Sequence, residues 1–542
     1  MTNKQIAKSF LLLSQLMELH SENPYKIRSY STAYNTLRKL GADLNEMSLE
    51  ELKSIPGVGD AISSKIAELL AKGNINKLEE YKNKTPEGIQ QMLSIKGLGI
   101  KKIQTIWHKM EITTVGELLY ACNENRLVDY EGFGQKTQED LKQKIDFFQR
   151  SLGKHLYANI LPWFLEIIDK INIKLPNSNC AMTGQIRRAM PIIEELAVVL
   201  MADKSEIEIL KELGDIEFHE ENKCILSIED EGELILYFSS KEAYPSLLFN
   251  TTGPSAFLKQ FASIGDNDVV KWENLSPIYR DNDVLVNNFI QSGSKPKPVE
   301  YSDLRGVLHN HSTWSDGVDT LEEFGNYVKE QGFEYLGISD HSRSAGYAGG
   351  LSIERVKSQW DAIDTLNLEW SGKFKILKGI ESDILIDGSL DYPDEILEGF
   401  DFVVASIHSV LQMDEVKATN RLIKAIEHPS TKILGHPTGR LLLARAGYPV
   451  NMPEVIEACA YFNVVIELNA NPNRLDLDWT WIPYAVEKGV KISINPDAHY
   501  KEAISDMKYG ILTAQKASLQ KEMCLNSLNL KEISAHFSIK KL

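Results

Sequence analysis

The spacing of hydrophobic residues divides the chain into regions with different periodicities. Up to about residue 150, apolar residues recur at helical spacing and glycine-rich breaks separate the segments, which predicts an all-helical region. From about 151 to 290, helical segments mix with short strand-like runs such as CILSI and ELILYFS. A stretch rich in Ser, Gly, Lys and Pro, IQSGSKPKPVEYSD, then predicts a linker at about 291–302.

From residue 303 to the end, strand-like and helical patterns alternate. Helical segments such as LEEFGNYVKEQG and IPYAVEKG separate seven apolar runs: RGVLHNH, EYLGISDH, FKILKGIES, DFVVASIHS, KILGHP, VVIELNA and KISINPDAH. Seven βα units predict a parallel sheet, most simply a distorted (βα)7 barrel that is closed or nearly closed. The expected fold is therefore multidomain: an all-α head over 1–150, an α+β domain over 151–290 and an α/β barrel over 303–542.

Composition and charge indicate where in the cell the protein works and what it can bind. No apolar run among the 542 residues approaches a membrane span, and the N-terminus is typical of a helix and not of a signal peptide. Five scattered cysteines argue against a disulfide framework and against a cysteine-based zinc site, so we expect a cytoplasmic monomer with no membrane partner. The formal net charge is -17, but residues 1–112 carry a net +4, which is compatible with a head that contacts phosphate.

Three glycine-containing loops repeat within the head: IPGVG at Ile55–Gly59, IKGLG at Ile95–Gly99 and EGFGQK at Glu131–Lys136. Two glycines around one apolar residue make a tight turn and leave backbone N–H groups bare at the start of the next helix, where they can hold a phosphate. A plain helix–helix turn is the alternative. The loops resemble helix-hairpin-helix motifs, which bind the DNA backbone without reading sequence. The expected contacts are Gly57, Gly59, Gly97, Gly99, Lys101, Gly132 and Gly134.

The head also resembles the N-terminal domain of the family X DNA polymerases. The resemblance rests on NPYKIRSYSTAYNTL, IPGVGDAISSKIAELLAKGNINKLEE and IKGLGIKKIQTIW. In that family the domain grips the 5′-phosphate of a gap, which implies DNA contacts at Lys26, Tyr30, Lys65 and Lys77. Lys65 matches the Schiff-base lysine of the members that have lyase activity, and a solvated helix face is the alternative for this residue.

The middle region resembles the family X polymerase palm but departs from it at the metal site. The segment Met182–Leu200 keeps three positions of the nucleotide-transfer signature: Gly184, Arg187 and Arg188. Gln185 replaces a serine, and Glu195-Leu196-Ala197 stands where the family has Asp-x-Asp, whose carboxylates hold two metal ions. The later strand ELILYFS has no carboxylate after its first residue, and NTTGPSAF has Pro254 where a serine is expected. We therefore expect a degenerate palm with polymerase activity lost.

The tail concentrates metal-ligating side chains at strand ends. Eight of the twelve histidines lie after residue 305, and six of these end predicted strands, interleaved with Asp and Glu. Residues two apart at a strand end point the same way, and the carboxyl ends of barrel strands are where active sites are built. Imidazole and carboxylate without thiolate suit Zn²⁺, Mn²⁺ or Fe²⁺. The expected ligands of a multinuclear site are His309, His311, Asp316, His341, Glu381, His408, His436, Asp497 and His499.

This ligand set resembles the polymerase-and-histidinol-phosphatase (PHP) family, whose distorted barrel holds up to three divalent metal ions. The resemblance implies one ion at His309, His311, Glu381 and Asp497; a second at Glu381, His408 and His436; and a third at Asp316, His341 and His499. Head, palm and tail together resemble bacterial family X polymerases with a C-terminal PHP domain.

The resemblance implies catalytic roles for Glu381, Asp497 and His341, and we expect Arg440 to grip phosphate. Arg343 and Arg474 are further candidates for phosphate contact, each with a plain surface role as the alternative. Asp340 is expected either to orient a ligand or to cap a helix.

The expected function is metal-dependent hydrolysis of DNA phosphodiesters in repair. The resemblance implies 3′-to-5′ exonuclease activity, with cleavage at abasic sites or processing of 3′ ends, on gapped or nicked duplex DNA. Two alternatives stay open: an active gap-filling family X polymerase with a PHP nuclease, and a small-molecule phosphatase acting on a compound such as histidinol phosphate.

Overall fold

The computed structural model describes residues 1–542 except 2, 39, 41, 96, 129, 151–152, 229–231, 263–274, 294–296, 371, 373 and 539–542. The chain divides into two compact units, one of residues 1–123 with 127–148 and the other of residues 124–126 with 149–542. Part of the expected linker, residues 294–296, lies outside the described residues. In the part of the chain that is described, no helix is both long and apolar enough to cross a membrane.

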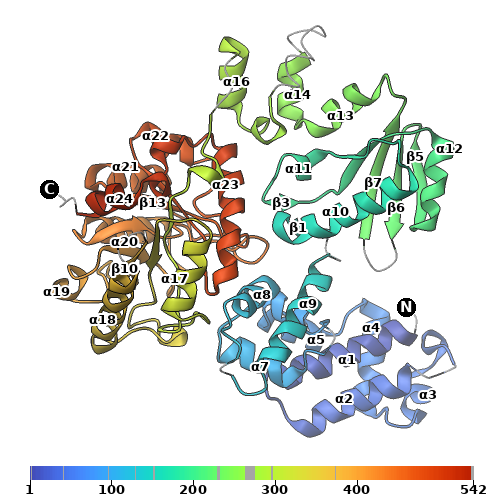
Figure 1. Cartoon of the computed structure of the whole chain (residues 1–542). Coiled ribbons are helices and arrows are strands. Elements are labelled where there is room, and N and C mark those ends of the chain that lie inside the picture. Colours follow the sequence, from blue (N-terminus) through green and yellow to red (C-terminus); the bar gives the residue numbers. More distant parts are fainter. Residues whose placement is uncertain are drawn as a thin grey trace. The chain divides into compact units, whose positions relative to one another are not determined.

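The first unit is built from helices around one apolar core, as the helical periodicity of the head predicts (Figure 1). Phe10, Leu13, Ile66, Ile103 and Leu118 are fully buried in that core. The helices are α1 (Asn3–Leu19), α2 (Pro24–Leu37), α3 (Leu49–Ser54), α4 (Asp60–Lys72), α5 (Asn76–Lys84), α6 (Glu87–Met92), α7 (Ile100–His108), α8 (Val115–Asn123) and α9 (Gln135–Arg150).

The three glycine loops of the head fold into the same turn. In each, the first glycine has a left-handed backbone: φ is 82° at Gly57, 86° at Gly97 and 91° at Gly132. The carbonyl of the second glycine then accepts the first hydrogen bonds of α4, α7 and α9, at 2.8–3.1 Å. A side chain at the first position would strain this turn, which explains why glycine recurs there.

The middle of the chain forms a five-stranded sheet covered by one long helix. Strand order is β2 (Ala181–Met182), β4 (Ala197–Met201), β7 (Gly232–Ser239), β6 (Lys223–Ile228) and β5 (Asp215–Glu220), with β4 and β7 parallel and the other pairs antiparallel. Helix α10 (Tyr157–Lys174) lies across the sheet (Figure 1) and shares its apolar core.

Shorter elements complete the middle region. A small antiparallel pair joins β1 (His155–Leu156) to β3 (Ile192–Ile193). The helices are α11 (Gly184–Arg187), α12 (Lys204–Ile207), α13 (Tyr244–Thr252), α14 (Ser255–Ala262) and α16 (Asp283–Ser292).

All seven strands predicted for the tail are present, in one parallel sheet that runs in chain order. They are β8 (Gly306–Val307), β9 (Tyr335–Ile338), β10 (Lys375–Asp383), β11 (Phe402–Ser406), β12 (Thr431–Leu434), β13 (Val465–Asn469) and β14 (Ile492–Asn495). A single parallel bridge between Asn310 and Ala498 brings the ends of the first and last strands together. The sheet is therefore a nearly closed barrel, as predicted.

Helices surround this barrel and fill the spaces outside its strands (Figure 1). They are α17 (Leu321–Glu330), α18 (Ile353–Glu369), α19 (Asp394–Leu397), α20 (Glu415–Glu427), α21 (Met452–Phe462), α22 (Ile482–Glu487) and α23 (Met507–Lys516). One more helix, α24 (Leu530–Phe537), packs on the inward-facing residues instead.

The period of two along each strand separates the inside of the barrel from its outside. Leu336, Ile376, Val403 and Ile466 pack in the large core shared with the surrounding helices. Their neighbours face inward and form a separate cluster with Ile533 and Phe537 of α24, which closes the amino-terminal end: Tyr335, Leu377, Phe402, Val404 and Val465. Farther along the same inward faces the residues become polar, and Glu381, Glu467, Asn469 and Asn495 are fully or almost fully buried. The barrel thus carries an apolar layer below a polar one.

Phe402 is the central side chain of the apolar layer. It is 1% exposed, and its ring fills the space above two glycines of neighbouring strands, Gly337 and Gly379, where a Cβ would lie within 2.7 Å of the ring. The Phe402→Ala variant is expected to lose about 3–5 kcal/mol from the unfolding free energy of the barrel, because a cavity replaces the ring. Urea denaturation followed by circular dichroism measures this loss.

The matched control is Ile386→Ala, whose side chain is 73% exposed and which should change the unfolding free energy by less than about 0.5 kcal/mol. Equal effects of the two variants would contradict the layered interior.

Candidate metal centre

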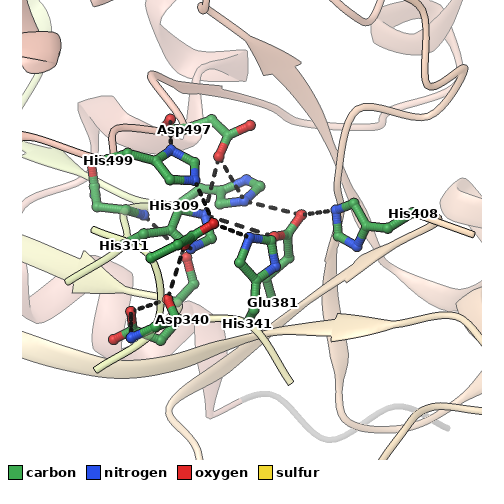
Figure 2. A network of polar contacts seen from close by, with 12 residues as sticks. His309, His311, Asp340, His341, Glu381, His408, Asp497 and His499 are labelled. Carbon is green, nitrogen blue, oxygen red and sulfur yellow. Dashed lines mark hydrogen bonds and ion pairs between the residues drawn. The ribbon is translucent and has the colours of Figure 1, made fainter. Parts of the chain in front are cut away.

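The nine side chains expected to bind metal lie together at the carboxyl-terminal rim of the barrel. His309, His311 and Asp316 follow β8, and His341 follows β9. Glu381 lies near the end of β10, whereas the remaining ligands follow the next strands: His408 after β11, His436 after β12, and Asp497 and His499 after β14. Figure 2 shows most of these side chains converging from different strands on one point.

Glu381 is at the centre of the cluster and is 1% exposed. Its Oε1 atom lies 3.2 Å from Nε2 of His309, 3.1 Å from Nε2 of His408 and 3.0 Å from Nε2 of His436. Its Oε2 atom lies 3.0 Å from Nδ1 of His341. One carboxylate therefore faces four imidazoles, as a bridging ligand between two ions would.

Two further carboxylates complete the arrangement. Oδ1 of Asp497 lies 3.1 Å from Nε2 of His311 and 3.5 Å from Nε2 of His309. Oδ2 of Asp316 lies 3.4 Å from Nε2 of His499 and 3.5 Å from Nε2 of His341. The ligand atoms fall into three overlapping groups in which all members lie within 4.8 Å of one another: His311, Asp316, His341 and His499; His309, His311 and Asp497; His341, Glu381 and His408.

The donor atoms fit divalent metal ions. Several buried atoms have no hydrogen-bond partner among the described residues, namely Nε2 of His309, Nδ1 of His311, Oδ2 of Asp316, Nδ1 of His341 and Nε2 of His499. Leaving such an atom unpaired in the interior costs about 1–3 kcal/mol. Bound ions would take up these lone pairs, so the pattern of unpaired atoms matches the ligand set.

Two carboxylates behind the ligands were missed by the sequence reasoning. Glu467 on β13 lies 2.6 Å from Nδ1 of His309, and Asp383 on β10 accepts a short hydrogen bond from Nδ1 of His408. A carboxylate in this place holds the imidazole in one orientation and leaves the other nitrogen for the metal. The available signal was an acidic residue inside the buried run VVIELNA, since an unpaired charge there would be costly.

Asp340, for which sequence left two roles open, binds the loop that follows β8. It accepts hydrogen bonds from the backbone and hydroxyl groups of Ser312 and Ser315, at 2.5–3.2 Å, and from Nε2 of Gln359 at 2.6 Å. None of these hydrogen bonds goes to a ligand side chain. Because the same loop carries Asp316, Asp340 acts on the site by holding this loop.

The arginines considered for phosphate contact occupy different positions. Arg440 donates from Nη1 to Asp478 at 2.6 Å and from Nε to the carbonyl of Arg474 at 3.0 Å, so it holds a loop beside the site. Arg343 donates to the carbonyl of Asp391 at 2.6 Å. The guanidinium of Arg474, only 6% exposed, lies 3.6 Å from the ligand Asp497. Of the three, Arg474 is therefore the one next to a metal ligand.

Burial and charge together set the protonation of the cluster. Burial lowers the pKa of His309, but Glu467 and Glu381 outweigh it and raise this pKa well above the ordinary value. The same balance raises the pKa of His341 beside Asp316 and of His408 beside Glu381. Without metal, these imidazoles therefore hold protons at neutral pH and balance the buried carboxylates.

Comparison with known proteins agrees with this geometry. Residues 308–471 match the PHP domain family, residues 1–75 match a helix-hairpin-helix domain family, and residues 89–145 match a SAM-like helix-hairpin-helix tandem. The DNA polymerase/3′-5′ exonuclease PolX of Bacillus subtilis is 32% identical over 574 aligned positions, which cover 99% of both chains. The chain belongs to the PolX family.

The barrel alone is similar to smaller proteins. A probable phosphatase of Thermoanaerobacter sp. (strain X514) is 28% identical over 41% of this chain and 90% of its own length. A probable phosphatase of Caldanaerobacter subterraneus has the same identity over 41% of this chain and 88% of its own length. A part of this PolX-family chain, 41% of its length, is therefore similar to nearly the whole length of smaller proteins.

In the middle region of this PolX-family chain, Glu195 and Ala197 stand at the two positions where the signature places metal-binding aspartates. Ala197 begins β4 and pairs with Ile235 of β7, whereas Glu195 lies before the strand and is exposed. Arg188 donates from Nε to both carboxylate oxygens of Asp281 at 3.1 Å and from Nη1 to the carbonyl of Thr252 at 2.6 Å. Among the described residues, every cluster able to hold a metal lies in the barrel.

The residues expected to contact DNA are spread over the helical unit. Lys26 and Tyr30 lie on α2, Lys65 on α4 and Lys77 on α5, while Lys101 is exposed in the first turn of α7. Tyr30 packs against the core, and Lys77 pairs with Glu80 at 2.8 Å. Lys101 follows the second glycine turn directly.

Metal binding should release protons, because the pKa values of His309, His341 and His408 are raised and a metal ion must displace the protons on these rings. Between pH 8 and pH 6 the apparent Mn²⁺ affinity is expected to fall by about tenfold per pH unit for each proton displaced. Calorimetric titration in two buffers with different ionisation enthalpies counts these protons. Equal heats in both buffers and an affinity independent of pH would refute the protonated cluster.

Proposed function

We propose that this PolX-family chain is a metal-dependent phosphodiesterase that trims the 3′ ends of DNA, a 3′-to-5′ exonuclease acting in repair. The observation that carries the proposal is the complete set of nine ligand side chains, with unpaired donor atoms that fit divalent ions. The relative that aligns over nearly the whole chain is named as both a polymerase and a 3′-5′ exonuclease. Mn²⁺, Zn²⁺ and Fe²⁺ all suit imidazole and carboxylate ligands.

The residues at the rim are proposed to have different roles in hydrolysis. Bound divalent ions lower the pKa of water and neutralise charge on the phosphoryl oxygens. Glu381 and Asp497 bring the imidazoles of His309, His311, His408 and His436 to one point. His341 lies between Glu381 and Asp316 and links the two ends of the cluster. Arg474, next to Asp497, is proposed to hold a phosphate oxygen, while Arg440 bonds to the carbonyl of Arg474 and keeps that loop in position.

The palm is proposed to have lost nucleotide transfer. That reaction needs carboxylates that hold two ions, and Ala197 and Ile235 offer none at the paired strand positions. In addition, Arg188, one of the two arginines retained from the nucleotide-transfer signature, forms an ion pair with Asp281. The three regions would then be a DNA-binding head at 1–150, a palm retained as a platform at 151–290 and the nuclease barrel at 303–542.

Two other functions share parts of this structure. An active gap-filling polymerase is favoured by the name of the full-length relative, and a small-molecule phosphatase by the relatives that match only the barrel. The phosphatase reading leaves the three glycine turns unexplained. We further propose a cytoplasmic monomer, in keeping with five free cysteines.

The deciding experiment uses the full chain, Mn²⁺ and a gapped duplex labelled at the 5′ end of the primer strand, with and without nucleotides. A nuclease with an inactive palm shortens the primer in both cases. The Asp497→Ala, His499→Ala double variant should fall below about one hundredth of the parent rate, because even residues behind the ligands cost 10–100-fold. Melting curves of both chelated proteins control for folding.

Other outcomes identify the alternatives. A primer that lengthens when nucleotides are present would show that the palm still transfers nucleotides. An unchanged primer, with rapid hydrolysis of a small phosphate ester that DNA does not inhibit, would identify a small-molecule phosphatase and exclude the nuclease.

The glycine turns generate a separate prediction for DNA binding. Replacing Lys101 and Lys102 by alanine should weaken binding of gapped DNA and reduce the slope of log affinity against log salt by about 1–2, since each phosphate contact contributes about 0.9. Fluorescence anisotropy at several salt concentrations measures both effects. The control replaces Lys174 and Lys211, which pair with Glu212 and Glu208 in the middle region. The same slope in parent and head variant would show that this turn does not touch DNA.

A further inference from the structure

The backbone of the metal centre is strained at three of its ligands. His309, His436 and Asp497 have φ values of 58°, 21° and 53°, which are positive values that residues other than glycine rarely adopt. The other six ligands are absent from the positive-φ residues of the described chain. Such strain persists only where surrounding contacts hold the residue in place.

All three strained ligands connect to one buried carboxylate, that of Glu467 on β13. Oε2 lies 2.6 Å from Nδ1 of His309, and Oε1 accepts the backbone N–H of His436 at 3.2 Å. The Nδ2 amide of Asn469 donates both to Oε1 of Glu467 at 2.9 Å and to Oδ2 of Asp497 at 3.0 Å. Asn495 adds a fourth donor to Glu467 at 2.8 Å.

The surroundings of Glu467 explain why these bonds matter. Its side chain is fully buried, and the only ion pair it makes among the described residues is with His309. A buried carboxylate without a lysine or arginine depends on hydrogen bonds for its stability. Because an ionised carboxylate only accepts, Nδ1 of His309 must carry the proton in this bond. Nε2 is then directed at Glu381 and Asp497, with its lone pair available to a metal ion when the ring is neutral.

We propose that Glu467 is the positioning residue of the metal centre: it fixes the tautomer of His309, holds the strained backbone of His436 and, through Asn469, holds the side chain of Asp497. It is not itself a ligand. The inference rests on the proposed metal-dependent function but assigns a role to a residue outside the nine ligands.

The test is the Glu467→Gln variant of the full chain, which keeps the size of the side chain. An amide presents a donor where the carboxylate accepts two hydrogen bonds, so either His309 and Asn495 or His436 and Asn469 lose their acceptor. We expect the affinity for Mn²⁺ to weaken by about 10–100-fold, the loss typical of partners behind metal ligands. Equilibrium dialysis of chelator-treated protein, followed by elemental analysis, gives the ions bound per chain and their affinities.

The matched control is Glu334→Gln, just before β9 and at the opposite end of that strand from the ligands, where Oε2 of Glu334 accepts the backbone N–H of Leu530. This variant should bind Mn²⁺ as the parent does. Melting curves of the metal-free proteins separate the two kinds of role, because a purely structural residue lowers the melting temperature without changing the affinity of the folded protein.

A folded Glu467→Gln variant that binds Mn²⁺ with parent affinity would overturn the proposal. Should that variant not fold, Asn469→Ala decides, since it removes the amide between Glu467 and Asp497 and leaves the carboxylate: weakened Mn²⁺ binding supports the proposal and parent affinity overturns it. A parent protein that binds no Mn²⁺ would instead refute the proposed function, so the two failures are distinguishable.

Discussion

The buried carboxylate of Glu381 is the feature on which the metal centre depends. Four imidazoles lie within 3.2 Å of its two oxygens, and a carboxylate buried in this way needs compensating positive charge or hydrogen bonds. The pKa values of His309, His341 and His408 are raised, so protons on these rings supply positive charge without metal, and divalent ions would supply it when bound. Protons and metal ions therefore compete for one set of lone pairs, which ties the chemistry of the rim to pH.

The barrel meets this requirement by separating its interior into layers. Near α24, inward-facing residues such as Phe402 and Val465 pack without polar atoms and supply stability. Two residues farther along β13 from Val465, the inward position is Glu467, and the next is Asn469. The same alternation along the strands that places apolar residues in the apolar layer thus also places the polar residues that support the ligands. The three ligands with strained backbones lie at the carboxyl-terminal rim, where hydrogen bonds from the polar layer hold them in place.

The middle region forms a packed sheet and helix where the family X resemblance expects catalytic residues. Its sheet keeps the parallel pairing of β4 with β7, and its core keeps the packing of α10. Ala197 begins β4 at a position where the resemblance expects a carboxylate, and Arg188 pairs with Asp281. Packing depends on many residues of similar character, whereas a metal site depends on a few residues of fixed identity, so the fold of this region does not require those few residues.

The sequence by itself determined the seven strands, the three glycine turns and the nine candidate ligands, because strand period, turn chemistry and ligand type are local properties. It could not reveal Glu467 or Asp383 as supports for His309 and His408, since these contacts join residues 158 and 25 positions apart. It named Arg343, Arg440 and Arg474 as candidates for phosphate contact without ranking their distance from the ligands, and the structure places Arg474 beside Asp497. Which arginine faces a site depends on how loops from different strands pack against each other, and only the tertiary structure decides that.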